Sequence, residues 1–228
     1  MKILIVAATR FEVRPLTDHF AFVQKEDETL SHFRYRNSDV DILITGMGMT
    51  ATAYHLGKQL AMTAYDLVIN AGVCGSFTAD IPIGEVVEIT EENFSELGAE
   101  SKNSFLTLFD LGLMEPDDPP FRSGKLINTT ITLSSALSDL RKVRGTTTNI
   151  IHGNPETIRK IIGIFRPDVE SMEGAAVFYA CLTAAIPFHQ VRGISNFVEE
   201  RDKSKWDIPL AIDNLNRVLL ELLQELTS

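Results

Sequence analysis

The first residue able to do chemistry is Glu12, which comes four residues after the apolar run Ile3–Ala8 ends. A carboxylate just beyond the carboxyl end of a buried strand can act as a general base toward a water molecule. An acid in the first turn of a helix also has a structural use, because it interacts favourably with the helix dipole. Position alone favours this structural interpretation, so a catalytic role depends on what gathers around Glu12.

Two glycine-containing segments follow apolar runs and precede polar or helical stretches. Gly46-Met47-Gly48 comes just before a helical pattern that begins near Thr50, and Asn70-Ala71-Gly72-Val73-Cys74-Gly75-Ser76 closes another apolar run. Such loops let a ligand approach the backbone, and a helix N-terminus favours anions. The third glycine of a dinucleotide fingerprint is missing. Each loop alone is more often a tight turn, but two at strand ends favour a shared crevice.

Two further segments could contact a small molecule. In Glu170-Ser171-Met172-Glu173, Glu173 could accept two hydrogen bonds from a vicinal diol, whereas Ser171 is a plausible helix cap. Asn196 ends an apolar run and offers one acceptor and one donor on a rigid group. That pair matches a 6-oxopurine, in which N7–H donates and O6 accepts. A turn asparagine is the structural alternative.

Several chemistries are disfavoured by what the sequence lacks. The five histidines show no HxxH or HExxH spacing, and there is no GxSxG or GxxxxGK[ST], so we expect no metal and no P-loop. Cys74 and Cys181 lie in apolar surroundings outside any CxxC, which favours a reducing, cytoplasmic location. A net charge of −10 argues against nucleic acid or an anionic membrane as partner. No apolar run is long enough to cross a bilayer, and the start does not read as a secretory signal.

Apolar runs and helical patterns alternate along the chain. Strands are predicted at Ile3–Ala8, Val40–Thr45, Leu67–Ala71, Glu85–Thr90 and Phe188–Ser195. Helices are predicted at Thr50–Met62, Pro155–Phe165, Glu173–Ala185 and along the apolar stripe from Ile208 to Leu226. The segments Glu91–Asn103 and Met114–Gly124 are predicted loops. We therefore expect a single α/β domain over residues 1–228, with three α/β/α layers and a mixed, largely parallel central sheet.

Together these segments resemble the purine nucleoside phosphorylase-like family, which includes the methylthioadenosine/S-adenosylhomocysteine nucleosidases. The resemblance runs nearly end to end, through MKILIVAATRFEV, LVINAGVCGS and VESMEGAAVFYACLTAAIPFHQVRGISN. It implies a nucleoside substrate, the nucleoside phosphorylase-like fold and no cofactor. Within the family, ESMEGAA followed by RGISN looks most like the hydrolases that release hypoxanthine.

The resemblance also implies a role for individual residues. Glu12 matches the catalytic glutamate that activates water, and Met172 and Glu173 match the pair that holds the ribose. Asn196 matches the base-recognition position, where the adenine-releasing enzymes have aspartate. Asparagine can donate to O6 and accept from N7–H, so this departure favours hypoxanthine or guanine. Gly72, Val73 and Ser195 are expected to contact the substrate because they lie in the matched loops.

Four further expectations concern the rest of the site and the assembly of the protein. Ile150 or Ile151 is expected to cover a face of the base, and Trp206 either covers the 5′ substituent or packs ahead of the last helix. A carboxylate on that substituent would need a cation, for which the candidates are Arg201, Lys203, Lys205 and Arg122. A homodimer or higher homo-oligomer is expected by analogy with the family, in which the apolar loop tip Pro119-Pro120-Phe121 could complete the pocket of a neighbouring subunit.

The nucleophile and the substrate leave alternatives open. Phosphorylases of the family place an arginine before the middle glycine loop, where this chain has Leu67–Gly72 without one, and Arg10 does not clearly match a phosphate site. Water is therefore the expected nucleophile. The alternatives are a methylthioadenosine/S-adenosylhomocysteine nucleosidase, a phosphorylase acting on inosine or guanosine, and a nucleoside-binding module without catalysis.

Overall fold

The computed structural model describes residues 1–101 and 104–227. The five predicted apolar runs form strands β1 (Lys2–Ala7), β4 (Ser38–Ile44), β5 (Leu67–Ser76), β6 (Val86–Glu92) and β12 (Phe188–Phe197). β5 and β12 are longer than predicted, because β5 continues through the glycine-containing segment to Ser76 and β12 continues through Asn196 to Phe197. The polar ends of two adjacent strands are therefore held rigidly in the sheet.

The predicted helices are α2 (Met49–Met62), α4 (Pro155–Phe165), α5 (Gly174–Thr183) and α6 (Ile208–Leu226). α4 begins where the local sequence indicates, because Oδ1 of Asn154 accepts hydrogen bonds from the backbone N–H groups of Glu156 and Thr157 at 2.8 and 3.3 Å. α6 buries one apolar stripe that includes Ile212, Leu215 and Leu219. Among the described residues, no helix is long and apolar enough to cross a membrane.

Other elements were not predicted. They are α1 (Arg10–Thr17), β2 (Ala21–Lys25), β3 (Leu30–Tyr35), β7 (Gly98–Ser101), β8 (Ser104–Thr107), β9 (Leu126–Ile127), α3 (Ser135–Ser138), β10 (Arg141–Thr147), β11 (Val169–Ser171) and the short 3₁₀ helix η1 (Lys203–Lys205). The predicted loop at Glu91–Asn103 is wrong in part, because β6 continues to Glu92 and β7 lies within it; its last two residues fall outside the described ones.

The central sheet is mixed, as expected, and it is barrel-like rather than simply largely parallel. β1 pairs in parallel with β4 and β5, and β12 pairs in parallel with β5, but β11 is antiparallel to β5 and β12 is antiparallel to β6. These pairings, with the parallel contacts of β10 to β6 and β11, close β5, β11, β10, β6 and β12 into a ring. The barrel-like ring therefore combines three parallel contacts with two antiparallel ones.

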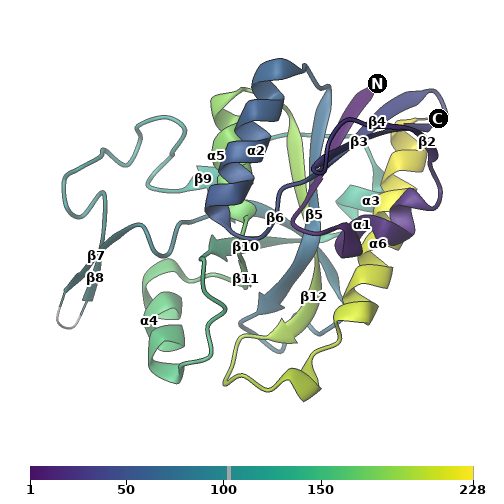
Figure 1. The fold of residues 1–228 in the computed structure, drawn as a ribbon. Helices are drawn as coiled ribbons and strands as arrows, with labels where there is room; N and C mark the ends of the chain where they lie inside the picture. The colour runs from purple at the N-terminus through teal and green to yellow at the C-terminus, as the bar shows by residue number, and fades with distance from the viewer. Residues whose placement is uncertain (102–103, 228) are drawn as a thin grey trace.

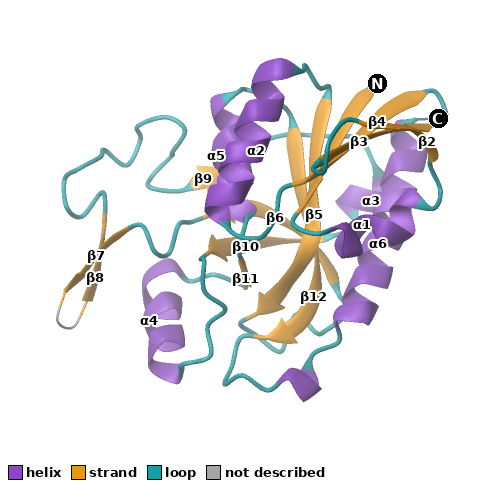
Figure 2. Ribbon diagram, viewed as in Figure 1, coloured by secondary structure: helices purple, strands orange, loops and turns teal. Residues whose placement is uncertain are grey.

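Helices cover both faces of the sheet (Figures 1 and 2). α2 and α5 pack on one face, where Leu56 and Phe178 belong to one apolar cluster. α1, α3 and α6 pack on the other face, where Leu16, Leu137 and Leu219 belong to a second cluster. This arrangement agrees with the predicted three layers. The β7–β8 hairpin projects away from them, beyond β9 and α4 (Figure 2).

The proline-rich loop differs from expectation at its apolar tip. Phe121 is only 7% exposed and makes edge or tilted ring contacts with Phe94, Phe109 and Tyr179. Its side chain therefore packs into its own subunit rather than projecting from the loop. The apolar tip expected at Phe121 is therefore not exposed, whereas completion of a neighbouring pocket by the Pro119-Pro120-Phe121 loop stays a prediction.

The interior of the strand ring holds a buried carboxyl group, Glu92. It is fully buried, and it accepts hydrogen bonds from the Gln190 amide at 2.8 Å and the Thr147 hydroxyl at 3.0 Å. Burial raises the pKa of Glu92 to about 7, although the two hydrogen bonds and nearby Arg192 oppose the rise. The folded protein therefore binds a proton here more tightly than the unfolded chain does.

We expect Glu92→Gln to flatten the pH dependence of the unfolding free energy. Since the folded pKa is raised from 4.5 to about 7, the wild-type protein loses stability as the pH rises between these values. The loss is about 1–3 kcal/mol, and a permanently neutral amide avoids it. Urea unfolding at pH 5 and pH 8 measures the difference.

A matched control comes from the same strand. Glu88 is also buried, but its bonds to His189 and Lys142 outweigh burial and lower its pKa. Its contribution to stability is present above the unfolded pKa, so Glu88→Gln should destabilise the protein at pH 8, where Glu92→Gln should not. An equal pH dependence in wild type and Glu92→Gln would contradict the prediction.

Candidate active site

A cavity of about 300 Å³ opens at the ends of β1, β5, β11 and β12, next to the start of α1. Its size suits a small organic ligand such as a nucleoside. Eight of the predicted site residues line it: Glu12, Val73, Ile151, Met172, Glu173, Ser195, Asn196 and Trp206. Gly72 and Ile150 do not line it. The topology thus brings together residues that are up to 194 positions apart in the sequence.

Glu12 caps a helix and also lines the cavity. Its Oε2 accepts hydrogen bonds from the backbone N–H and the hydroxyl of Thr9 at 2.8 and 2.9 Å, which caps α1. Its Oε1 lies 3.3 Å from the backbone N–H of Val73, at the cavity wall. One oxygen therefore fixes the side chain while the other remains placed to accept a proton from a ligand or water.

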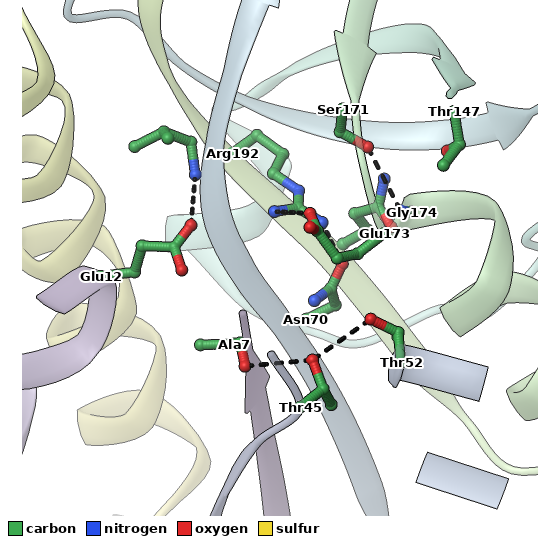
Figure 3. A network of polar contacts seen from close by, with 12 residues as sticks. Ala7, Glu12, Thr45, Thr52, Asn70, Thr147, Ser171, Glu173, Gly174 and Arg192 are labelled. Atoms are coloured by element: carbon green, nitrogen blue, oxygen red, sulfur yellow. Dashed lines mark hydrogen bonds and ion pairs between the residues drawn. The ribbon is translucent and has the colours of Figure 1, made fainter. Parts of the chain in front are cut away.

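Arg192 is the main functional residue that the sequence analysis left unassigned. Its guanidinium is fully buried, donates to Oδ1 of Asn70 at 2.6 Å and lies 4.0 Å from Oε2 of Glu173 (Figure 3). A charged residue within an apolar strand was the signal that could have found it. Its Nε is one of the few buried polar atoms without a partner among the described residues.

Gly72, which is expected to contact the substrate, does not line the cavity, and its lack of a side chain leaves space for two charged groups. A Cβ built at this position would lie 2.0 Å from Nη1 of Arg192 and 2.9 Å from Oε1 of Glu12. The missing side chain therefore leaves room for the guanidinium and the carboxylate to approach the same point. Because Gly72 has no side chain, a water molecule beside its backbone could donate to Glu12 and accept from Arg192.

Glu173 lies immediately before α5, and the first glycine loop helps to hold it. Its Oε1 accepts a hydrogen bond from the backbone N–H of Gly48 at 3.0 Å. Burial raises the pKa of Glu173, and the negative charge of Glu12 adds to the rise, while Arg192 opposes it. The negative charges of Glu12 and Glu173 therefore repel each other, and the positive charge of the Arg192 guanidinium partly offsets this repulsion.

Asn196 lies near the end of β12 and is oriented by its neighbours. The Ser195 hydroxyl donates to Oδ1 of Asn196 at 2.8 Å, and Nδ2 of Asn196 donates to the backbone oxygen of Phe197 at 3.0 Å. One further amide hydrogen and one lone pair are left for a ligand. Ser195 is thus a positioning residue for the amide.

The described residues that line the cavity include no Lys, Arg or His, but they include three glutamates, Glu12, Glu170 and Glu173. Arg10 is directed away, because its guanidinium donates to the backbone oxygen of Glu28 at 2.7 Å. Burial raises the pKa of the Cys74 thiol to about 12, so this lining residue is not a thiolate nucleophile. The site is therefore suited to acid–base chemistry on a neutral ligand.

A second residue missed by sequence reasoning is Asn216 of α6. Its Nδ2 donates to the backbone oxygen of Glu12 at 2.8 Å, and its Oδ1 accepts from the backbone N–H of Leu16 at 3.1 Å. These bonds fix α1, and hence Glu12, to the last helix. A polar residue inside the apolar stripe of α6 was the available signal.

Fold and site together define a class of protein. The Phosphorylase superfamily matches residues 2–224, and the chain therefore belongs to this superfamily. The family resemblance drawn from the sequence is confirmed. Two solved structures share the fold: the native futalosine hydrolase of Helicobacter pylori strain 26695 and the 5′-methylthioadenosine/S-adenosylhomocysteine nucleosidase of S. pneumoniae with a transition-state inhibitor. Their TM-scores are 0.80 and 0.81 at 16% and 20% identity, covering 99% of this chain and 98% and 100% of theirs.

Among curated relatives, the chain is similar to the futalosine hydrolase of Acidothermus cellulolyticus, with 28% identity over 228 residues, 97% of this chain and 90% of the relative. It is also similar to a 5′-methylthioadenosine/S-adenosylhomocysteine nucleosidase of Glaesserella parasuis, with 24% identity over 233 residues and 98% of both chains. Both relatives carry the names of enzymes that act on nucleosides.

Proposed function

We propose that this protein is an N-glycosidase that hydrolyses futalosine, releasing hypoxanthine and dehypoxanthine futalosine in menaquinone biosynthesis. The observation that carries the proposal is one cavity that gathers Glu12, Glu173 and Asn196. Three of the curated relatives are named futalosine hydrolases, which supports the same reaction. We further propose that residues 1–228 form one catalytic domain, since the superfamily match spans almost all of them.

The mechanism follows from the geometry of the two carboxylates. Cleavage of the glycosidic bond passes through a ribosyl cation with oxocarbenium character. A water molecule placed between Glu12 and Arg192 attacks the anomeric carbon and gives its proton to Glu12. The bond to N9 breaks and its electron pair leaves with the base. Glu173 binds the 2′- and 3′-hydroxyls, and its negative charge stabilises the developing cation.

Asn196 supports the departure of a 6-oxopurine. Its amide donates to O6 and accepts from N7–H, so it stabilises the base protonated at N7. Because an amide does not supply a proton, the proton at N7 comes from solvent. Adenine offers a donor in place of O6, which leaves two donors facing each other. Two buried donors that face each other without an acceptor cost about 1–3 kcal/mol of binding free energy.

Water is favoured over phosphate by the charges around the proposed nucleophile. Arg192 already faces Glu173 and the space beside Glu12, so a dianion placed there would meet two carboxylates and a single guanidinium. Arg10 is held at Glu28 instead of reaching the cavity. The repulsion between a phosphate dianion and these two carboxylates disfavours phosphorolysis.

The other end of the cavity supports an aromatic carboxylate on the 5′ carbon, as futalosine has. Trp206 lines the cavity, and the Arg201 guanidinium lies over its ring at 5.7 Å. Lys205 is paired with Glu199 at 2.8 Å. Of the four cations considered, Arg201 is therefore the one we propose to meet the substrate carboxylate. Ile151 lines the same cavity and is proposed to cover the base, whereas Ile150 is 61% exposed outside it.

We also propose a homo-oligomer. An apolar groove between α2 and α5 is lined by small side chains such as Ala53, Gly57 and Ala180. A groove of this composition supports close packing of another helix, and a second copy of this chain is its proposed occupant.

The proposed function predicts hypoxanthine release from futalosine, independent of phosphate. Chromatography of the products from futalosine, inosine and methylthioadenosine, each with and without phosphate, measures this. Adenine released from methylthioadenosine would instead support the nucleosidase alternative, which the likeness to the Glaesserella parasuis enzyme favours. Release that requires phosphate would contradict hydrolysis.

A further inference from the structure

The helix that carries Glu12 is too short to hold its shape alone. α1 spans eight residues, and isolated helices shorter than about 12 residues are marginal in water. Pro15 lies inside this helix. A proline has no backbone N–H, and its ring crowds the carbonyl group four residues earlier, here that of Phe11, so it kinks or weakens a helix. The proposed general base therefore lies on a helix that needs support from outside.

One side chain of the last helix gives this support. Oδ1 of Asn216 accepts a hydrogen bond from the backbone N–H of Leu16 at 3.1 Å, and Nδ2 of Asn216 donates to the backbone oxygen of Glu12 at 2.8 Å. Leu16 and Glu12 are four residues apart, so they form a pair that a regular α-helix joins directly. The carboxamide of Asn216 therefore bridges one step of the helical hydrogen-bond ladder, beside Pro15.

Asn216 is itself held in place. It is 5% exposed, and its Nδ2 also donates to the backbone oxygen of Ile212, one turn earlier in α6, at 2.7 Å. Both hydrogens of the amide are therefore used. Ile212 lines the cavity, as Glu12 does. The amide thus links the part of the cavity wall that α6 forms to the backbone of the proposed general base.

The carboxylate of Glu12 has little freedom to adjust if its backbone moves. Its Oε2 accepts two hydrogen bonds from Thr9, and its Oε1 lies 3.3 Å from the backbone N–H of Val73. A reacting group that is misplaced by about 1 Å can lower a rate by about 10²-fold. A shift of α1 against α6 would therefore carry the carboxylate away from the attacking water.

We propose that Asn216 is a positioning residue for Glu12, and that it acts by completing the helix that Pro15 interrupts. The inference rests on the proposed function and deepens it, because it assigns the placement of the general base to the last helix. Asn216 does not line the cavity, so it acts without touching the substrate. Loss of its amide should therefore lower kcat and leave KM nearly unchanged.

Asn216→Leu tests the proposal, because leucine fills a similar volume and has no polar side-chain group. We expect kcat for hypoxanthine release from futalosine to fall at least about tenfold, with KM close to that of the wild type. Turnover is expressed per folded molecule, counted from the stoichiometry of hypoxanthine binding in calorimetry, so a loss of folded protein does not imitate the effect. An unchanged kcat would overturn the inference.

Asn214→Leu is the matched control. Asn214 lies on the same helix and donates from Nδ2 to the backbone oxygen of Gly84 at 2.7 Å, but it does not line the cavity. Its substitution removes a comparable bond between α6 and the rest of the protein, and it should leave kcat unchanged. An equal fall of kcat in both variants would show that general loosening of α6 is responsible, and would contradict the proposal.

Rescue by Pro15→Ala gives a result that a merely structural role of Asn216 would not produce. Alanine restores the N–H at residue 15 and lets the N–H of Leu16 bond directly to the carbonyl of Glu12. Pro15→Ala alone should leave kcat near the wild-type value, because Asn216 still bridges the pair. Combined with Asn216→Leu, it should recover most of the lost kcat. A double variant no faster than Asn216→Leu would overturn the inference.

The outcomes for Asn216 and for the proposed function are distinguishable. If the wild type hydrolyses futalosine and Asn216→Leu keeps its kcat, only the inference about Asn216 fails. If the wild type cleaves methylthioadenosine instead of futalosine, the proposed function fails, and the same variants measured with methylthioadenosine still decide the inference. A wild-type protein that cleaves neither nucleoside would contradict both.

Discussion

Replacement of Glu12 by glutamine is expected to lower kcat for hypoxanthine release by about 10²- to 10⁴-fold. The amide cannot take the proton of the attacking water, so the general base is lost. The helix cap should survive, because the amide oxygen can still accept from the N–H and the hydroxyl of Thr9. Binding of free hypoxanthine, measured by calorimetry, should therefore stay within a few fold of wild type.

The control for Glu12→Gln is Glu156→Gln, which removes another first-turn acid, in this case from the start of α4. It should leave kcat unchanged, since Glu156 is exposed and does not line the cavity. A Glu12→Gln variant with full turnover would show that the residue is only a helix cap. A wild-type protein that binds nucleosides but never cleaves them would support the binding-module alternative.

Glu173→Gln is expected to reduce kcat/KM for a ribonucleoside by about 10²-fold or more. The carboxylate is proposed to accept two hydrogen bonds from the ribose, and bonds to a charged group are worth about 1.5–3 kcal/mol each. The amide has one acceptor fewer and no charge to stabilise the ribosyl cation. The contact with the Gly48 N–H can persist through the amide oxygen, so the loop should keep its conformation.

The matched comparison for Glu173→Gln is a 2′-deoxy substrate. The wild-type protein should lose much of its kcat/KM on this substrate, and the variant should lose little more, because the deleted hydroxyl was a partner of the deleted charge. If the loss of kcat/KM caused by Glu173→Gln and the loss caused by removal of the 2′-hydroxyl simply add, Glu173 does not bind the diol. The pKa of Glu173 is raised by burial, so the wild-type rate should also fall on the acidic side at a higher pH than an ordinary carboxylate would give. The variant should lack this dependence.

The parts of the fold that depend on local sequence could be predicted. α4 begins at Pro155 as predicted, because Asn154 caps it, and α6 follows the stripe from Ile208 to Leu226. The β2–β3 hairpin escaped prediction, because β2 is exposed along its whole length and shows no pattern of burial. The antiparallel return of β11 to β5 involves only two residue pairs, which leave no signal in composition.

The site residues that could be predicted are those whose side-chain type and sequence context by themselves indicate a role. Glu12, Glu173 and Asn196 all line the cavity, as the family resemblance implied. Arg192 was not found, because its role depends on Asn70 and Glu173, which approach it only after the ring of strands has closed. Gly72 was assigned to the substrate, but its use is to leave space for that guanidinium. Long-range packing of this kind is absent from any local pattern.

The open end of the sheet has a consequence for the behaviour of the protein at high concentration. Closure of β5, β11, β10, β6 and β12 leaves these strands with partners on both sides, whereas β2 pairs only with β3 among the described strands. β2 exposes Phe22 and Val23, so chains could add edge to edge at this strand and aggregate. The register shift after Phe22 and the charge of Lys25 counteract such addition. Solubility can therefore be engineered at β2, at the opposite end of the sheet from the strand ring.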